Sequence, residues 1–118
     1  MQRAHVIAAH RVPDQPSIRV SAGDAVTLGE RDSEWPQFVW ATLAQGLGGW
    51  IPAVLFDGQV GTATALEDYD TRELAADPEE ILVLQRAQAG WWWAQNAGGH
   101  SGWIPAHALE PLHVTDTA

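Results

Sequence analysis

Cysteine is absent from the 118 residues of the chain. This absence excludes disulfide bonds, thiolate metal sites and cysteine nucleophiles, so we expect packing to provide the stability. Aromatic rings other than indole are also scarce, because one Tyr and two Phe stand against seven Trp. An indole combines a large apolar ring with a polar N–H, which suits a core edge or a binding surface.

Long hydrophobic runs are missing as well. The apolar run Val6 to Ala9 is too short for a secretory signal and is flanked by His5 and His10. No stretch approaches the roughly 20 apolar residues of a membrane span. The sequence therefore predicts a cytoplasmic protein that does not act at a membrane.

Positive charge is scarce, and none of it comes from lysine. Six Arg stand against 15 acidic residues, which gives a net charge of −9. Such a surface repels phosphate backbones, so nucleic acid is not expected as a partner, whereas neutral or basic proteins are. The charge is uneven, with −2 up to Asp57 and −7 after it.

A repeat organises the rest of the sequence. The pentapeptide GWIPA occurs at 49–53 and again at 102–106, a shift of 53, and SIRVSAGDAVTL (17–28) lies over ELAADPEEILVL (73–84) at a shift of 56. The sequence therefore predicts a duplication with units of about 55 residues. We place the domains at 1–57 and 62–114, with a tail at 115–118 and Asp57 to Gly61 as the linker.

Short stretches rich in Val, Ile, Leu and Trp are separated by Gly and Pro, without a sustained helical period. This pattern predicts an all-β fold of two tandem, five-stranded small barrels. We expect strands at 25–28 and 81–84, at 91–95 and at 100–104, a tight hairpin turn at 96–99, and a short helical turn after Pro52 and after Pro105.

Four ordered motifs in the second unit carry a resemblance. Ala65-Leu-Glu-Asp-Tyr69, an acidic loop that ends at Glu73-Leu74, Trp91-Trp92-x-Ala94 and Gly102-Trp-Ile-Pro105 resemble the ALYDY, ELSF, WWxA and G-aromatic-Ile-P motifs of the Src homology 3 (SH3) domain. The first unit is similar but divergent, with Ala9 to Pro13 in the ALYDY position. The whole chain resembles bacterial-type variant SH3 domains in tandem.

The resemblance implies a binding module that holds polyproline II segments in an aromatic groove. In the second unit it places Tyr69, Trp91 and Pro105 on the ligand face, and in the first unit Trp35 and Pro52. Glu73 and Asp70 would attract a ligand Arg or Lys, whereas Ser17 stands at the acid's place in the first unit. The expected partner is a protein or peptide that contains proline, is basic, or both.

Departures from the family pattern keep other interpretations open. Glu67 and Ala108 replace two groove tyrosines, and the acidic loop is three or four residues shorter than usual, which weakens the case for ordinary PxxP binding. Strand alternation places Trp92 in the core and Trp93 at the surface. Trp50 and Trp103 either cover a barrel edge or line a contact between the units.

The alternative function is structural: an assembly protein, a homodimer or an accessory subunit whose indoles mediate packing. None of the five His has metal-ligand spacing, and His100-Ser101 lies in a hairpin without a placed acid. We therefore predict no catalytic residue, no metal site, no cofactor and no enzymatic activity.

Overall fold

The computed structural model describes residues 2–112, and the predicted tail 115–118 lies outside the described residues. The chain divides into two compact units. Unit 1 is formed by residues 1–15 together with 72–118, and unit 2 by residues 16–71. The predicted domains, 1–57 and 62–114, are therefore wrong in their boundaries, because each compact unit combines pieces of both repeats.

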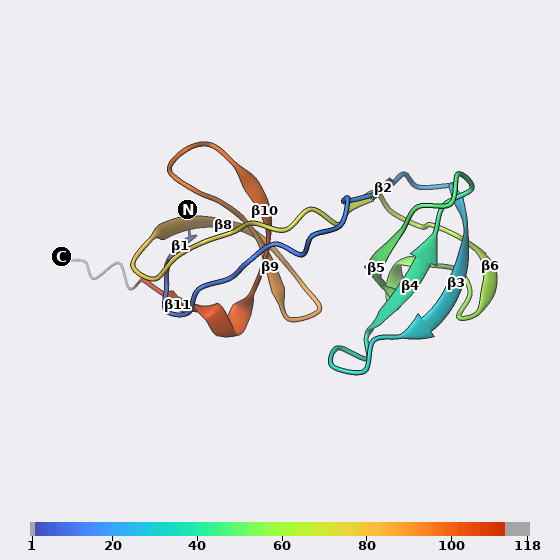
Figure 1. Ribbon diagram of the computed structural model, residues 1–118, viewed down its shortest axis with the longest axis horizontal. Helices are drawn as coiled ribbons and strands as arrows, with labels where there is room; N and C mark the ends of the chain where they lie inside the picture. Colours follow the sequence, from blue (N-terminus) through green and yellow to red (C-terminus); the bar gives the residue numbers. More distant parts are fainter. Residues whose placement is uncertain (1, 113–118) are drawn as a thin grey trace. The chain divides into compact units, whose positions relative to one another are not determined.

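Unit 1 contains one antiparallel sheet in the order β10-β9-β8-β1-β11. In Figure 1 the first strand, β1, lies beside β8 and β11. A single 3-10 turn, η2, connects β10 to β11. The elements are β1 (Gln2–Val6), β8 (Ile81–Gln88), β9 (Trp91–Gln95), β10 (Ser101–Pro105), η2 (Ala106–Ala108) and β11 (Leu109–Pro111).

Unit 2 contains a four-stranded sheet in the order β5-β4-β3-β6 and a separate pair, β2-β7. Its 3-10 turn, η1, follows β5 as η2 follows β10. The elements are β2 (Arg19–Val20), β3 (Ala25–Arg31), β4 (Phe38–Thr42), β5 (Gly48–Pro52), η1 (Ala53–Leu55), β6 (Gly61–Thr64) and β7 (Tyr69–Asp70).

The opening strand of each repeat completes the sheet of the other repeat. Gln2 pairs with Leu84 in unit 1, and Gly61 pairs with Leu28 in unit 2, so β1 and β6 occupy equivalent places at a shift of 59. The loops follow the same pattern, since His10 pairs with Ala76 and Tyr69 pairs with Val20. His10 is therefore the structural counterpart of Tyr69.

The loop lengths give a physical reason for this exchange. Six residues separate His10 from Ser17, but only Asp70, Thr71 and Arg72 separate Tyr69 from Glu73. Short connections favour strand exchange, because a segment that cannot turn back easily on its own neighbour pairs with another sheet of the same kind. The short acidic loop that the sequence indicated is thus the place where the chain passes from unit 2 to unit 1.

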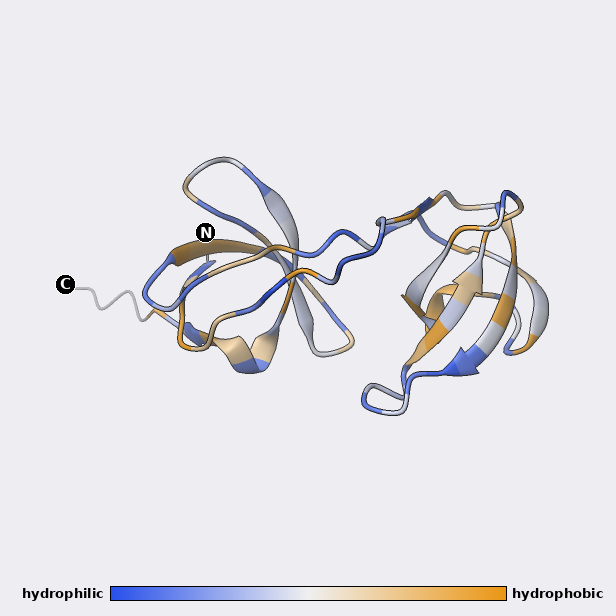
Figure 2. Ribbon diagram, viewed as in Figure 1, coloured by the Kyte–Doolittle hydropathy of each residue, from blue (hydrophilic) through white to orange (hydrophobic). Residues whose placement is uncertain are grey.

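Alternation of buried and exposed side chains explains the strands. In β8, Leu82 and Leu84 are buried whereas Ile81 is exposed, and the start of this strand is strongly hydrophobic in Figure 2. The two leucines join a buried cluster with Val6 and Ile104, and Trp92 packs against its edge. Burial of such side chains stabilises each by about 1.5–3 kcal/mol.

The all-β prediction is confirmed, and so are its local features. The predicted strand 91–95 coincides with β9, and three-residue 3-10 turns follow Pro52 and Pro105. The hairpin turn at 96–99 places Gly99 at φ 86°, a conformation that glycine adopts without steric cost. This architecture is compatible with an SH3-like fold.

The predicted linker Asp57 to Gly61 is wrong. Phe56 pairs with Ala65, the Asp57 N–H donates to the Thr64 carbonyl over 3.1 Å, and a carboxylate oxygen of Asp57 accepts from the Thr64 N–H over 2.8 Å. The segment is therefore a turn inside unit 2. Its Gly and Asp residues indicated a turn correctly, but such residues do not distinguish a hairpin from a connection between domains.

Candidate functional site

The seven predicted ligand-face residues are divided between the two units. Glu73, Trp91 and Pro105 belong to unit 1. The other four, Tyr69, Asp70, Trp35 and Pro52, belong to unit 2. The predicted groove of Tyr69 with Trp91 and Pro105 does not form within one unit, because the chain crosses between them at Thr71 and Arg72.

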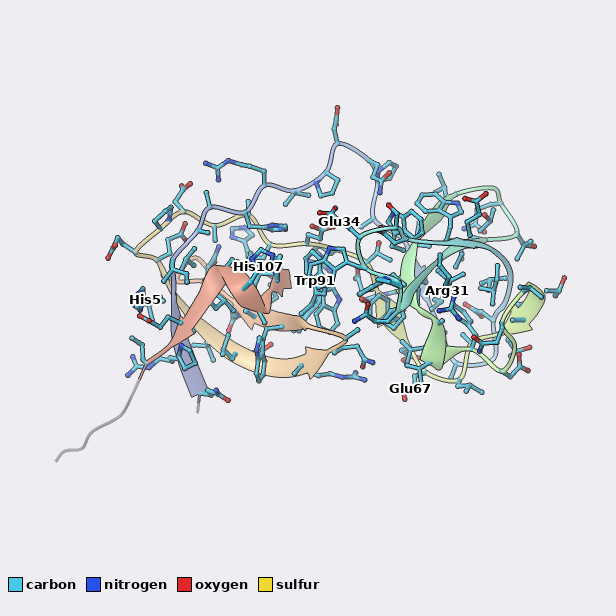
Figure 3. The ribbon with its side chains drawn as sticks, turned by 90° about the horizontal axis from the view of Figure 1, so that it is seen from below. His5, Arg31, Glu34, Glu67, Trp91 and His107 are labelled. Carbon is cyan, nitrogen blue, oxygen red and sulfur yellow. The ribbon has the colours of Figure 1, made fainter. Side chains whose placement is uncertain are left out.

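In unit 1, His10 takes the place that the sequence assigned to Tyr69. Its ring lies edge-on to the indole of Trp91, with 5.6 Å between centroids and 78° between the planes. Its Nε2 lies 2.8 Å from Oε1 of Glu73. We call the surface formed by His10, Glu73 and Trp91 the Trp91 face; Trp91 is labelled in Figure 3.

Backbone pairing fixes these three side chains. Trp91 begins β9 opposite Pro105, directly after the two-residue turn Ala89-Gly90. Glu73 lies beside β10, because it forms a parallel bridge with Trp103 and the next residue, Leu74, donates its N–H to the Trp103 carbonyl over 2.9 Å. Trp91 is therefore placed by the sheet, whereas His10 and Glu73 lie in loops that single bridges to Ala76 and Trp103 hold in place.

Three residues expected on ligand faces are mostly inaccessible. Tyr69 is 7% exposed, Pro52 is among the fully buried side chains, and Pro105 is buried. They contribute to packing in this structure and do not present open walls to a peptide. Trp91, Glu73, Trp35 and Asp70 are half-buried and retain accessible surface.

The register corrects the assignment of Trp35. Phe38 pairs with Pro52 in unit 2, as Trp91 pairs with Pro105 in unit 1. Phe38, which is 6% exposed, is therefore the counterpart of Trp91, and Trp35 lies in the loop before β4. The physical reason is an insertion of three residues in the first repeat, which appears in the sequence as the change of shift from 56 to 53. It lengthens this loop to 33–37, where unit 1 has the two-residue turn Ala89-Gly90.

Four other indoles form two pairs, each within one unit. Trp93 lies edge-on to Trp103 at 5.4 Å, and Trp40 lies edge-on to Trp50 at 5.1 Å. The guanidinium of Arg72 lies 5.9 Å from the Trp93 ring, within the range of a cation–π contact. These pairs place Trp50 and Trp103 against neighbouring strands of their own sheets.

In each unit an ion pair is formed by the residue that follows His10 or its counterpart Tyr69. That residue is basic in unit 1 and acidic in unit 2. In unit 1, Arg11 follows His10, and its Nη2 lies 2.8 Å from Oδ1 of Asp77. In unit 2, Asp70 follows Tyr69, and its Oδ2 lies 3.8 Å from Nε of Arg19. Asp70 therefore has a basic neighbour inside its own unit.

No group of three His, Asp or Glu side chains within residues 2–112 is arranged to hold a metal ion. The helical elements of the same residues are short 3-10 turns, and none is long and apolar enough to cross a membrane.

Comparison with known families adds to this geometry. Residues 67–112 match the variant SH3 domain family. The chain therefore carries one variant SH3 domain in this stretch, and SH3-type domains are protein-interaction modules. The match begins with β7 in unit 2 and continues through β8 to β11 in unit 1. No solved structure matches the chain.

Sequence reasoning missed His10 as part of the site. It placed the ALYDY counterpart at Ala9 to Pro13, whereas the pairing of β1 places Val6 to His10 over Ala65 to Tyr69. The available signal was that small apolar residues stand at every second position in both segments, Ala4 and Val6 in one and Ala63 and Ala65 in the other. The correspondence was hard to see because His10 stands where the other segment has a tyrosine.

Proposed function

We propose that the chain is a non-enzymatic protein-binding module that takes a proline-containing segment of a partner protein at the Trp91 face. The observation that carries this proposal is the half-exposed Trp91 ring, which the sheet and the edge-on contact with His10 hold in place. A flat, preorganised indole suits an already extended polyproline II segment, which loses little entropy on docking.

A cytoplasmic location of the protein stays a prediction.

The variant SH3 match supports an interaction role for this part of the chain. The face has one accessible indole wall, whereas Pro105 beside it is buried. A short peptide on such a surface has few anchors. We therefore expect a dissociation constant of about 0.1 mM, which corresponds to ~5.5 kcal/mol.

The test is a calorimetric titration of the full chain with decaproline, supported by amide and indole N–H spectra. We expect Trp91→Ala to weaken binding by at least about tenfold, because an aromatic anchor typically contributes more than 1 kcal/mol. Trp35→Ala is the matched control, since it removes a half-buried indole from the 33–37 loop of unit 2. Equal losses in the two variants, or no binding by the wild type, would contradict the proposal.

A second candidate function is assembly through unit 2. Val54 and Leu66 are 71% and 55% exposed, and they lie close together because the Leu66 N–H donates to the carbonyl of Leu55 over 2.7 Å. Exposed apolar side chains that lie together often mark an interface. Sedimentation equilibrium tests this candidate: a homodimer that Val54→Ser/Leu66→Ser abolishes supports it, and a wild type that stays monomeric at millimolar concentration rejects it.

A further inference from the structure

The carboxylate of Glu73 already has a partner inside unit 1. His10 Nε2 lies 2.8 Å from Glu73 Oε1, and the two side chains are only 16% and 23% exposed. A carboxylate only accepts hydrogen bonds, so the N–H of His10 donates. Replacing this bond would require moving a mostly buried ring that also packs against Trp91.

A second acid on the same segment also has a partner within unit 1, although this pair is exposed. Asp77 accepts from the guanidinium of Arg11 over 2.8 Å, and the same guanidinium lies 3.4 Å from the Ala76 carbonyl. Two consecutive residues of the exchanged segment, His10 and Arg11, thus supply cationic or donor groups to two acids of unit 1. An arriving arginine would have to compete with both.

Unit 2 lacks both members of the His10–Glu73 pair at the corresponding positions. Tyr69 stands where unit 1 has His10, and Ser17 stands where unit 1 has Glu73. The histidine is therefore present where the acid is present, and both are absent from the other unit.

We propose that His10 is the specificity-determining residue of the Trp91 face. It engages one carboxylate oxygen of Glu73 from within the chain and lies against a side chain that is only 23% exposed, so the face selects neutral proline segments and does not favour arginine-bearing ones. This inference rests on the proposed function and narrows its ligand class. It replaces the expectation from sequence that Glu73 attracts a ligand Arg or Lys.

The test compares two peptides on the full chain by calorimetry: decaproline, and the same peptide with one Arg at each end. For the wild type we expect the two dissociation constants to agree within about twofold. In His10→Phe the carboxylate loses its internal donor while an aromatic ring is kept, and we expect about a tenfold preference for the arginine peptide, as for a charge-assisted hydrogen bond. His10→Phe/Glu73→Gln should lose that preference.

Glu73→Gln alone keeps the test independent of how well His10→Phe folds. Because His10 already engages the carboxylate, we expect the ratio of the two dissociation constants to stay near one in this variant, as in the wild type. The ring nitrogen signals of His10 should shift, which verifies that the hydrogen bond to Glu73 has changed. Arg86→Gln, an exposed charge change on β8, is the matched control.

Three results would overturn the inference. The first is a wild type that already prefers the arginine peptide about tenfold and loses this preference in Glu73→Gln. The second is a folded His10→Phe variant without any preference. Both leave the proposed function standing, because peptides still bind at Trp91. The third, in which neither peptide binds any variant, removes the proposed function and the inference together.

Discussion

Unit 1 and unit 2 share the pairing of four strands, β10-β9-β8-β1 and β5-β4-β3-β6, but differ on the side where a ligand would dock. β1 in unit 1 and β6 in unit 2 occupy the same register, yet His10 and Glu73 face Trp91 in one unit, whereas Tyr69 and Ser17 hold the corresponding positions in the other. Charge differs too, since unit 1 has four Arg and seven acids and unit 2 has two Arg and eight acids. The two units therefore agree in the register of these strands and differ in the side chains beside them.

The largest difference between the units is expected at one pair of equivalent glycines. A Cβ on Gly102 would lie 2.6 Å from the backbone carbon of Glu73, whereas a Cβ on Gly49 would meet only side-chain atoms of Ile18 and Thr71, at 3.0 Å or more. Backbone cannot give way as side chains can, so Gly102→Ala should destabilise the protein by about 3 kcal/mol or more, and Gly49→Ala by about 1 kcal/mol. Urea denaturation measures both, and equal losses would contradict the closer approach at Gly102.

The next effect concerns Val6, a residue of the first repeat that is fully buried in unit 1. Val6→Ala should cost about 1–2 kcal/mol, because it leaves a small cavity in the core. Hydrogen exchange should then increase in β8 and β11, not in β3. Ile7→Ala, which changes an exposed neighbour, is the control and should stay within about 0.5 kcal/mol of wild type. Faster exchange in β3 would mean that Val6 packs with its own repeat.

The smallest effect on stability is expected in the turn Ala89-Gly90, which precedes Trp91 in unit 1. Unit 2 has the longer 33–37 loop before Phe38. Ala89 has φ 52° and Gly90 has φ 87°, the positive values that a two-residue hairpin turn requires. Ala89→Asn should raise stability by about 0.5–1 kcal/mol, because asparagine tolerates this region better than alanine. Ala97→Asn, in a turn residue without positive φ, should change thermal stability little. A loss of stability in Ala89→Asn would contradict this account of the turn.

Much of the fold could be predicted from the sequence. Alternation in Ile81 to Leu84 identified a strand, and the glycines of 96–99 identified a hairpin, because both signals depend on a few neighbouring residues. The two GWIPA segments lie in equivalent places, each at the end of a strand, β5 or β10, that leads into a 3-10 turn. These features are local or repeated, so a single sequence contains enough information to find them.

The exchange of β1 and β6 could not be predicted in this way. Both sheets offer the same backbone hydrogen bonds to an opening strand, so the choice depends on the lengths of the connections, above all on Asp70 to Arg72. The placement of the candidate residues followed from that error: Trp91 and Glu73 lie in the same unit, but His10 lies beside them where the sequence analysis had placed Tyr69. Whether these residues bind a ligand stays a prediction. A three-residue insertion likewise misdirected the assignment of Trp35.

The exchange itself is open to direct measurement, because the chain has no native cysteine and two introduced cysteines report a single contact. Arg3 pairs with Val83 in the structure, and Thr62 pairs with Thr27. Under mild oxidation, we expect Arg3→Cys/Val83→Cys to form a disulfide within one chain and Thr62→Cys/Val83→Cys to remain reduced. The reverse result, a disulfide between positions 62 and 83 and none between 3 and 83, would show that each repeat folds on its own strand and would contradict the exchange.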